Sequence, residues 1–304
     1  MLVPGRNFRG YGGRPPAVHW PNGAYVAVNI VVNYEEGSEY SFWQGDKRNE
    51  TLGEVSYDYP RGVRDLAMES MYEYGSRAGI WRVLGLFEEY KIHATVFGCA
   101  QAFEVNREVA EGCRAGGHDL LSHGWRWSEH WTMSREEEAR DMERAIASFE
   151  ETWGSRPIGW YCRYGPSVNT RDLLLEEGGF LYDSDAYNDD LPYFVEVRGR
   201  RHLVIPYSLT TNDVQGDRAP GTLWDFSKRA LDELWREGER GSGKMMSVGL
   251  HPRFAGQPSR ANAVREFIEY ALGKGRVWFA RRSEIAQWWL EQYSDKAADG
   301  MLAR

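Results

Sequence analysis

The sequence has few cysteines, no long apolar run and no cluster of basic residues. Its three cysteines, Cys99, Cys113 and Cys162, are sparse and odd in number, which is typical of free thiols in a reducing compartment rather than of a disulfide framework. No segment approaches the roughly 18 apolar residues of a membrane span, and residues 1–8 hold no apolar run of secretory length. These absences predict a cytoplasmic protein that does not bind a membrane.

The charge balance argues against a nucleic-acid partner. Lysine and arginine total 37 against 45 aspartates and glutamates, a net charge of −8 with histidines neutral, and no stretch gathers basic residues densely. The chain has 304 residues, of which 42% are hydrophobic, so it can bury a large core. We therefore predict a single catalytic domain over residues 1–304.

Two segments of this domain are expected to lack regular structure. Residues 1–23 are rich in glycine and proline, which predicts an extended N-terminal arm that wraps the domain or reaches a neighbouring subunit. Residues 38–63 are polar and aromatic without periodicity, and their length makes them a candidate lid or interface element.

The rest of the chain alternates between strand and helix patterns. Residues 24–32 form an apolar run rich in β-branched residues with no polar face, so they predict a strand buried on both sides. Further strands are predicted at 94–97, 118–122, 157–161, 180–182, 202–206, 244–250 and 277–279. One or two helices are predicted over 65–90, with Gly75 and Gly79 as the candidate break between them, and further helices at 104–115, 134–153, 169–177, 223–235, 261–272 and 283–290. This alternation predicts an α/β fold with a parallel sheet curled into a barrel of seven or eight β/α units.

Residues suited to catalysis follow the predicted strands directly. They are Glu35 and Glu36, His123, Arg163, Asp183 and Asp185, and His251. Because the carboxyl ends of parallel strands share one face, we expect these side chains to converge at one site. Two buried adjacent carboxylates there must be compensated by a cation, an arginine or a shared proton.

Acids, histidines and an arginine at one site are typical of a hydrolase. We predict that Glu35 is the general base, that His251 is the general acid and that Arg163 keeps a carboxylate ionised. Either Asp183 or Asp185 is expected to orient a histidine. The predicted substrate contacts are Glu36, His123, Trp127, Tyr164 and Arg253.

Other reactive residue types have simpler interpretations. His19, His93, His118 and His202 have no acid or arginine near a strand end, so we interpret them as structural or exposed. Cys162 lies beside Arg163 and could be a nucleophile, but a small buried residue at a strand end is the favoured interpretation.

These motifs, in this order, resemble those of the polysaccharide deacetylase (NodB-homology) superfamily. The matching segments are Asn33 to Gly37, Ser122 to Trp127, Arg163 to Pro166, Tyr182 to Ser184 and Leu250 to Pro252. The resemblance covers nearly the whole chain and implies a distorted β/α barrel with motifs at the strand ends. It also implies that Glu35 is the base and that Glu36 corresponds to a metal ligand.

The chain departs from the family's metal motif, His-x-x-x-His, because Trp127 stands at the position of the second histidine. If a zinc or another divalent metal binds, the expected ligands are Glu36, His123 and His130. The motifs at 33–37, 68–75 and 249–253 are similar to those of the bacterial allantoinases that need no metal. That resemblance implies ring opening of a cyclic amide in purine catabolism, no required cofactor, and a homo-oligomer, in particular a tetramer.

Three functions therefore remain open from the sequence. The leading hypothesis is an allantoinase-like amidohydrolase that acts on a small cyclic amide. The second is a metal-dependent de-N-acetylase of an N-acetylated sugar or polysaccharide. The third is a catalytically inactive binding member of the family.

Overall fold

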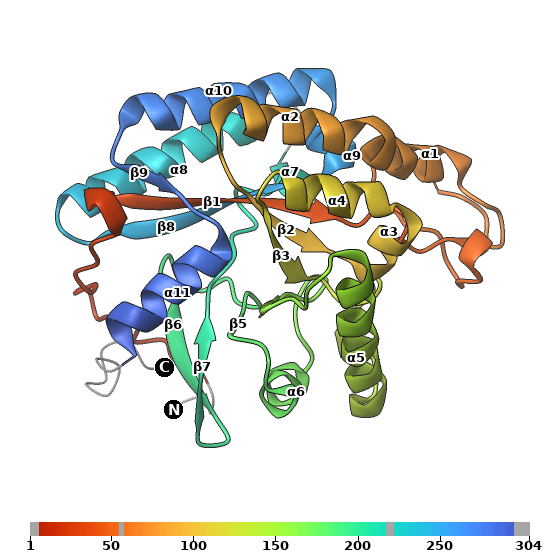
Figure 1. Cartoon of the computed structure of the whole chain (residues 1–304), viewed down its shortest axis with the longest axis horizontal. Helices are drawn as coiled ribbons and strands as arrows, with labels where there is room; N and C mark the ends of the chain where they lie inside the picture. Colours follow the sequence, from red (N-terminus) through yellow and green to blue (C-terminus); the bar gives the residue numbers. More distant parts are fainter. Residues whose placement is uncertain (1–5, 55–57, 217–221, 295–304) are drawn as a thin grey trace.

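The strands form one curled sheet in the computed structural model, which describes residues 6–54, 58–216 and 222–294 (Figure 1). Within those residues the strands are β1 (Val26–Tyr34), β2 (Thr95–Gly98), β3 (Asp119–Ser122), β4 (Gly159–Trp160), β5 (Tyr182–Asp183), β6 (Tyr193–Val197), β7 (Arg200–Val204), β8 (Lys244–Leu250) and β9 (Val277–Phe279). Their order is β6-β7-β5-β4-β3-β2-β1-β8, and β9 also pairs with β1. Each pair is parallel except β6 with β7.

The helices pack around this sheet, with α2, α8 and α10 along one side of β1 and β8 in Figure 1. They are α1 (Leu66–Tyr74), α2 (Ile80–Tyr90), α3 (Ala100–Val105), α4 (Arg107–Ala115), α5 (Arg135–Thr152), α6 (Thr170–Glu177), α7 (Asp213–Gly216), α8 (Thr222–Glu239), α9 (Pro252–Ala255), α10 (Pro258–Lys274) and α11 (Arg282–Tyr293). The predicted capping box at the start of α5 is confirmed by reciprocal hydrogen bonds between Ser134 and Glu137.

The sheet curls, but its two end strands do not pair with each other to close a barrel. Among the described residues, the path of hydrogen-bonded strands ends at β6 on one side and β8 on the other. Coil segments meet β8 instead: Met245 N donates to Asp190 O at 2.9 Å, and Gly249 N donates to Thr211 O at 2.9 Å. The predicted α/β barrel is therefore a curled, partly open sheet, and residues 211–213 lie beside the end of β8.

Strand β1 lies in the centre of this arrangement, and all nine of its residues are buried. Its two faces pack into different apolar clusters, Val28 and Ile30 in one and Ala27 and Val31 in the other, which explains why the sequence shows an apolar run without alternation. The predicted strands are all confirmed, but β6 was not predicted. It pairs with β7 through a two-residue turn at Arg198 and Gly199, both with positive φ, as expected for a tight hairpin.

Of the two alternatives for residues 65–90, the structure has one continuous helical segment, because the chain stays helical from α1 to α2 through a π-helical turn, Gly75–Gly79. The two glycines permit close approach instead. A Cβ on Gly75 would lie 2.4 Å from Glu36 Oε1, and one on Gly79 would lie 2.1 Å from Pro252 O. This turn therefore packs directly against the acid motif and the start of α9.

The described part of the N-terminal arm is held against the domain. Trp20 donates from its indole Nε1 to Lys244 O at 2.7 Å and packs on Trp288 with ring centroids 4.7 Å apart. Gly243 N donates to Val18 O at 3.0 Å. Residues 1–5 lie outside the described residues. No helix in the described ranges has the length and apolar character needed to span a membrane.

Candidate active site

Glu35 and Glu36 follow β1 directly and are almost completely buried, each with 1% of its surface exposed. Strand pairing places them, because the register that aligns Val32 with Leu250 puts His251 beside Glu35. Strand β3, which is separated from β1 by β2, delivers His123 at the same edge of the sheet. The predicted convergence of the first, second and last motifs is thus confirmed.

Both histidines face Glu35. His123 Nε2 lies 3.4 Å from Glu35 Oε1, and His251 Nε2 lies 3.5 Å from the same oxygen. His123 Nδ1 donates to Tyr161 O at 2.9 Å, since a carbonyl can only accept. This contact fixes the ring so that Nε2 points to the acid.

Asp213 holds His251 from the other side. Its Oδ1 lies 2.5 Å from His251 Nδ1, and its Oδ2 accepts from His251 N at 2.7 Å. Burial lowers the pKa of His251, but the charges of Asp213 and Glu35 outweigh burial and raise it to about 9. His251 is therefore protonated at neutral pH and can act as an acid.

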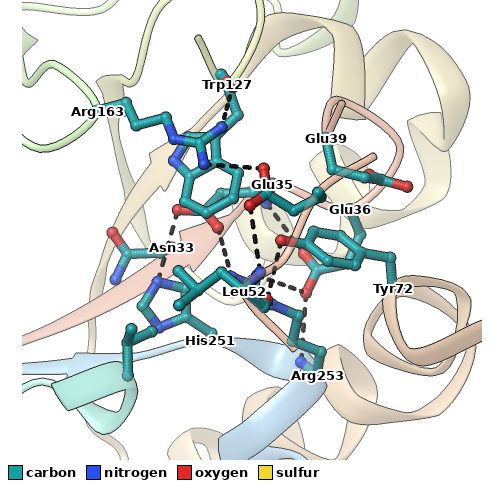
Figure 2. Close-up of polar contacts among 12 residues, drawn as sticks. Asn33, Glu35, Glu36, Glu39, Leu52, Tyr72, Trp127, Arg163, His251 and Arg253 are labelled. Carbon is teal, nitrogen blue, oxygen red and sulfur yellow. Dashed lines mark hydrogen bonds and ion pairs between the residues drawn. The ribbon is translucent and has the colours of Figure 1, made fainter. Parts of the chain in front are cut away.

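Arg253 is the cation that compensates the two glutamates (Figure 2). Its Nη2 lies 2.9 Å from Glu35 Oε2, and its Nη1 lies 3.7 Å from Glu36 Oε1. Burial raises the pKa of Glu35, yet Arg253, His251 and His123 together hold that pKa well below its usual range. Burial raises the pKa of Glu36 to about 7, against the smaller opposing effect of Arg253. The pair is thus asymmetric, with Glu35 the ionised member.

A cavity of about 270 Å³ opens beside Glu35. Its aromatic and aliphatic lining residues are Leu52, Trp127, Tyr161, Tyr164, Leu209 and Val214. Its polar lining residues are Asn33, Glu35, His123, Asn212 and His251. Of the predicted substrate contacts, His123, Trp127 and Tyr164 line this cavity. Glu36 and Arg253 do not line it and lie behind Glu35, which argues for an indirect role.

The segment predicted as a lid reaches this cavity. Leu52 lines it, and Glu50 Oε2 lies 2.8 Å from Arg163 Nη2, with both side chains 3% exposed. Arg163 also donates to Trp127 O at 2.8 Å and stacks on the Trp127 ring, 3.6 Å from its centroid. Arg163 therefore pairs with Glu50 on the lid segment, whereas Arg253 keeps Glu35 ionised.

Asp183 belongs to a different cluster. It accepts from Arg171 Nε at 2.8 Å and contacts His202 Nε2 at 3.0 Å, and these partners hold its pKa at about 2 despite burial. Asp185 accepts from Cys162 N at 2.8 Å. The prediction that Asp183 or Asp185 orients a catalytic histidine is corrected, because Asp213 takes that position at His251.

The expected metal ligands are not brought together. His130 Nε2 contacts Asp141 Oδ2 at 3.3 Å, while Glu36 contacts Arg253 and His123 contacts Glu35. In the ranges that the structure describes, no group of three or more His, Cys, Asp or Glu side chains is arranged to hold a metal ion. The donors that a zinc site needs are therefore paired with other groups, and the residues present do not fit a metal.

Cys162 is buried and burial raises the pKa of its thiol well above the usual range, which agrees with the packing interpretation. Sequence reasoning missed Asp213 and Glu50, because neither follows a predicted strand. The only available signal for Asp213 was an acid in the segment between two predicted elements.

Comparisons with known proteins identify the family of this chain. A profile of the polysaccharide deacetylase family matches residues 63–180. A Schizosaccharomyces pombe protein whose name describes a polysaccharide deacetylase is 35% identical over 317 residues, covering 96% of this chain and 99% of that protein. The chain belongs to the polysaccharide deacetylase family.

Two solved structures of similar size share this fold. A probable polysaccharide deacetylase from Pseudomonas aeruginosa PAO1 is 45% identical with a TM-score of 0.89, covering 95% of this chain and 99% of that one. Puue allantoinase is 44% identical with a TM-score of 0.90, covering 96% of this chain and 99% of that one. Solved structures similar to this chain thus carry two different activity names, polysaccharide deacetylase and allantoinase.

Proposed function

We propose that this member of the deacetylase family is a hydrolase that opens a small cyclic amide by attack of water, as an allantoinase does. The observation that carries the proposal is the shape of the cavity. It is small, has aromatic walls, and is bounded by Leu52 on a segment anchored through Glu50 and Arg163. Such a cavity suits a compact planar ligand better than the interior of a polymer chain.

The charges at the cavity suit the two proton transfers. Ionised Glu35 takes a proton from a water molecule while the oxygen of that water bonds to the amide carbon. The C–N bond then breaks, and protonated His251 gives its Nε2 proton to the leaving nitrogen. Two groups whose pKa values lie on opposite sides of neutrality can perform both transfers at one pH. His123 contacts the same oxygen of Glu35 as His251 does and keeps that carboxylate in place.

The proposal extends to conditions and setting. We infer that the reaction needs no metal, since Arg253 already compensates the acids. The substrate would be a free small molecule met in the cytoplasm, in keeping with the sparse, buried thiols. A homo-oligomer, in particular a tetramer, is proposed from the resemblance.

A second candidate is a de-N-acetylase of an N-acetylated sugar, which the names of the Pseudomonas and Schizosaccharomyces relatives favour. The same base and acid would then act on an acetamide. This candidate needs a sugar terminus to enter the cavity.

The test is hydrolysis of allantoin by the purified protein, with and without a chelator, beside an N-acetylglucosamine oligomer. We expect chelator-resistant turnover of allantoin and no acetate from the oligomer. Glu35→Gln and His251→Ala should each remove turnover while leaving the fold intact, and His19→Ala, which changes an exposed histidine, should not. Acetate release without allantoin turnover would establish the second candidate instead, and full activity in either site variant would refute the assigned roles.

A further inference from the structure

Two adjacent carboxylates lie in the interior of this protein with almost no contact with water. Removing an ionised carboxylate from water costs several kcal/mol unless an opposite charge and hydrogen bonds compensate. Glu35 and Glu36 thus require a positive charge at the position between them. In the described residues that charge is the guanidinium of Arg253, with contacts to both carboxylates at 2.9 and 3.7 Å.

The guanidinium is confined on its other sides as well. Its central carbon lies 4.3 Å from the centroid of the Tyr72 ring and 4.9 Å from that of Phe254, and its Nε donates to Leu52 O at 3.3 Å. Arg253 is 1% exposed. These contacts fix the charge in one place, and they leave it no path to swing into the cavity.

Trp127 completes this environment. It stands where the family motif has its second metal-binding histidine, and its ring centroid lies 5.3 Å from the guanidinium of Arg253 and 3.6 Å from that of Arg163. An indole face attracts a cation through its π-electrons, whereas a histidine would supply a lone pair to a metal. The ring of Trp127 therefore contacts the guanidinium of Arg253 at a position where it can supply no lone pair to a metal.

We propose that the guanidinium of Arg253 occupies the position that a divalent cation would take at Glu35 and Glu36, and that its contacts at 2.9 and 3.7 Å hold Glu35 aimed at the cavity. Arg253 acts through Glu35 and does not line the cavity, so it is a positioning residue. The kinetic test of this inference rests on the proposed hydrolysis, whereas the zinc titration does not.

The first measurement is zinc binding, which needs no substrate. Chelator-treated wild-type protein and Arg253→Ala are each titrated with Zn²⁺ alone by calorimetry. We expect no tight binding to the wild type. The alanine variant should bind about one equivalent, because both carboxylates lose their cation and His123 Nε2 lies 3.4 Å from Glu35 Oε1 as a further donor. Glu36→Gln in the Arg253→Ala background should weaken that binding.

The second measurement separates kcat from KM. Arg253→Met keeps the length and removes the guanidinium that contacts Glu35 at 2.9 Å, so we expect kcat to fall at least about tenfold while KM stays within a few-fold of the wild type. Arg253→Lys keeps a positive charge and should lie between the methionine variant and the wild type. A merely structural role would change kcat and KM together.

The outcomes separate the two proposals. Tight stoichiometric zinc binding to the wild type, lost in Glu36→Gln, would overturn the role of Arg253 even if the alanine and methionine variants fail to fold. An unchanged kcat in a folded Arg253→Met would overturn it as well. Absence of turnover with every cyclic amide would instead refute the proposed function, while the zinc titration would still decide the role of Arg253.

Discussion

The contact between Asp213 and His251 allows a quantitative test of the proposed acid. Replacing Asp213 with asparagine removes the negative charge 2.5 Å from His251 Nδ1 while keeping the size of the side chain. The amide oxygen can still accept from the backbone N of His251, as Oδ2 does now at 2.7 Å. The substitution therefore removes the charge of the side chain that contacts His251, with little change in packing.

The magnitude follows from the pKa of His251. Its value of about 9, against an ordinary 6.5, results from burial opposed by the charges of Asp213 and Glu35. At about 1.4 kcal/mol for each pKa unit, the difference favours the protonated ring by about 3 kcal/mol. Without Asp213 we expect a pKa near or below 6.5. The protonated fraction at pH 8 would then fall about 30-fold, and kcat/KM should fall with it.

The assay is kcat/KM for ring opening across the range from about pH 5 to pH 10. In Asp213→Asn the alkaline limb should move from near 9 to below about 7, and activity at pH 6 should return to within a few-fold of the wild type. Asp225→Asn makes the same chemical change at an exposed position of α8 and should leave the profile unmoved. An alkaline limb that stays near 9 in Asp213→Asn would refute this reasoning.

The same pair predicts a pH dependence of stability. Between about 6.5 and 9 the folded state holds a proton on His251 that the unfolded state has lost, so the free energy of unfolding falls as pH rises. The contribution is complete below that window and absent above it. Urea denaturation near pH 6 and near pH 9.5 should show this loss in the wild type, and a smaller loss in Asp213→Asn.

Two further substitutions test the lid segment and the packing behind the site. Glu50→Gln removes the nearer carboxylate of the buried Arg163 guanidinium and leaves only Glu129 Oε1, 3.8 Å from Nε, so we expect a loss of about 3 kcal/mol in unfolding free energy and a raised KM. Denaturation and steady-state kinetics measure both, and unchanged values of both would contradict a lid role. Gly79→Ala places a Cβ 2.1 Å from the backbone oxygen of Pro252, so it should cost about 1–3 kcal/mol and lower activity. Gly85→Ala meets no atom within 4 Å and is the matched control, with equal behaviour of the two variants counting against the packing argument.

Much of the fold was predictable because buried parallel strands have a distinct pattern. The run at 24–32 lacks alternation of apolar and polar residues, since β1 is covered on both faces. Glu35 and Glu36 follow β1 directly, so they lie at its carboxyl end. The exception was β6, a hairpin strand whose only local sign was the Arg198-Gly199 turn. The glycines at 75 and 79 left the prediction open because glycine marks both helix breaks and close backbone contacts, and the sequence does not distinguish them.

The sequence by itself predicted which strand ends bring the candidate residues to one face, since the carboxyl ends of parallel strands share that face. It left open whether a metal, an arginine or a shared proton compensates Glu35 and Glu36. Tertiary structure decided for Arg253 rather than Arg163, and for Asp213 rather than Asp183. The physical reason is that charge pairing depends on separations of a few ångströms between residues that are tens or hundreds of positions apart.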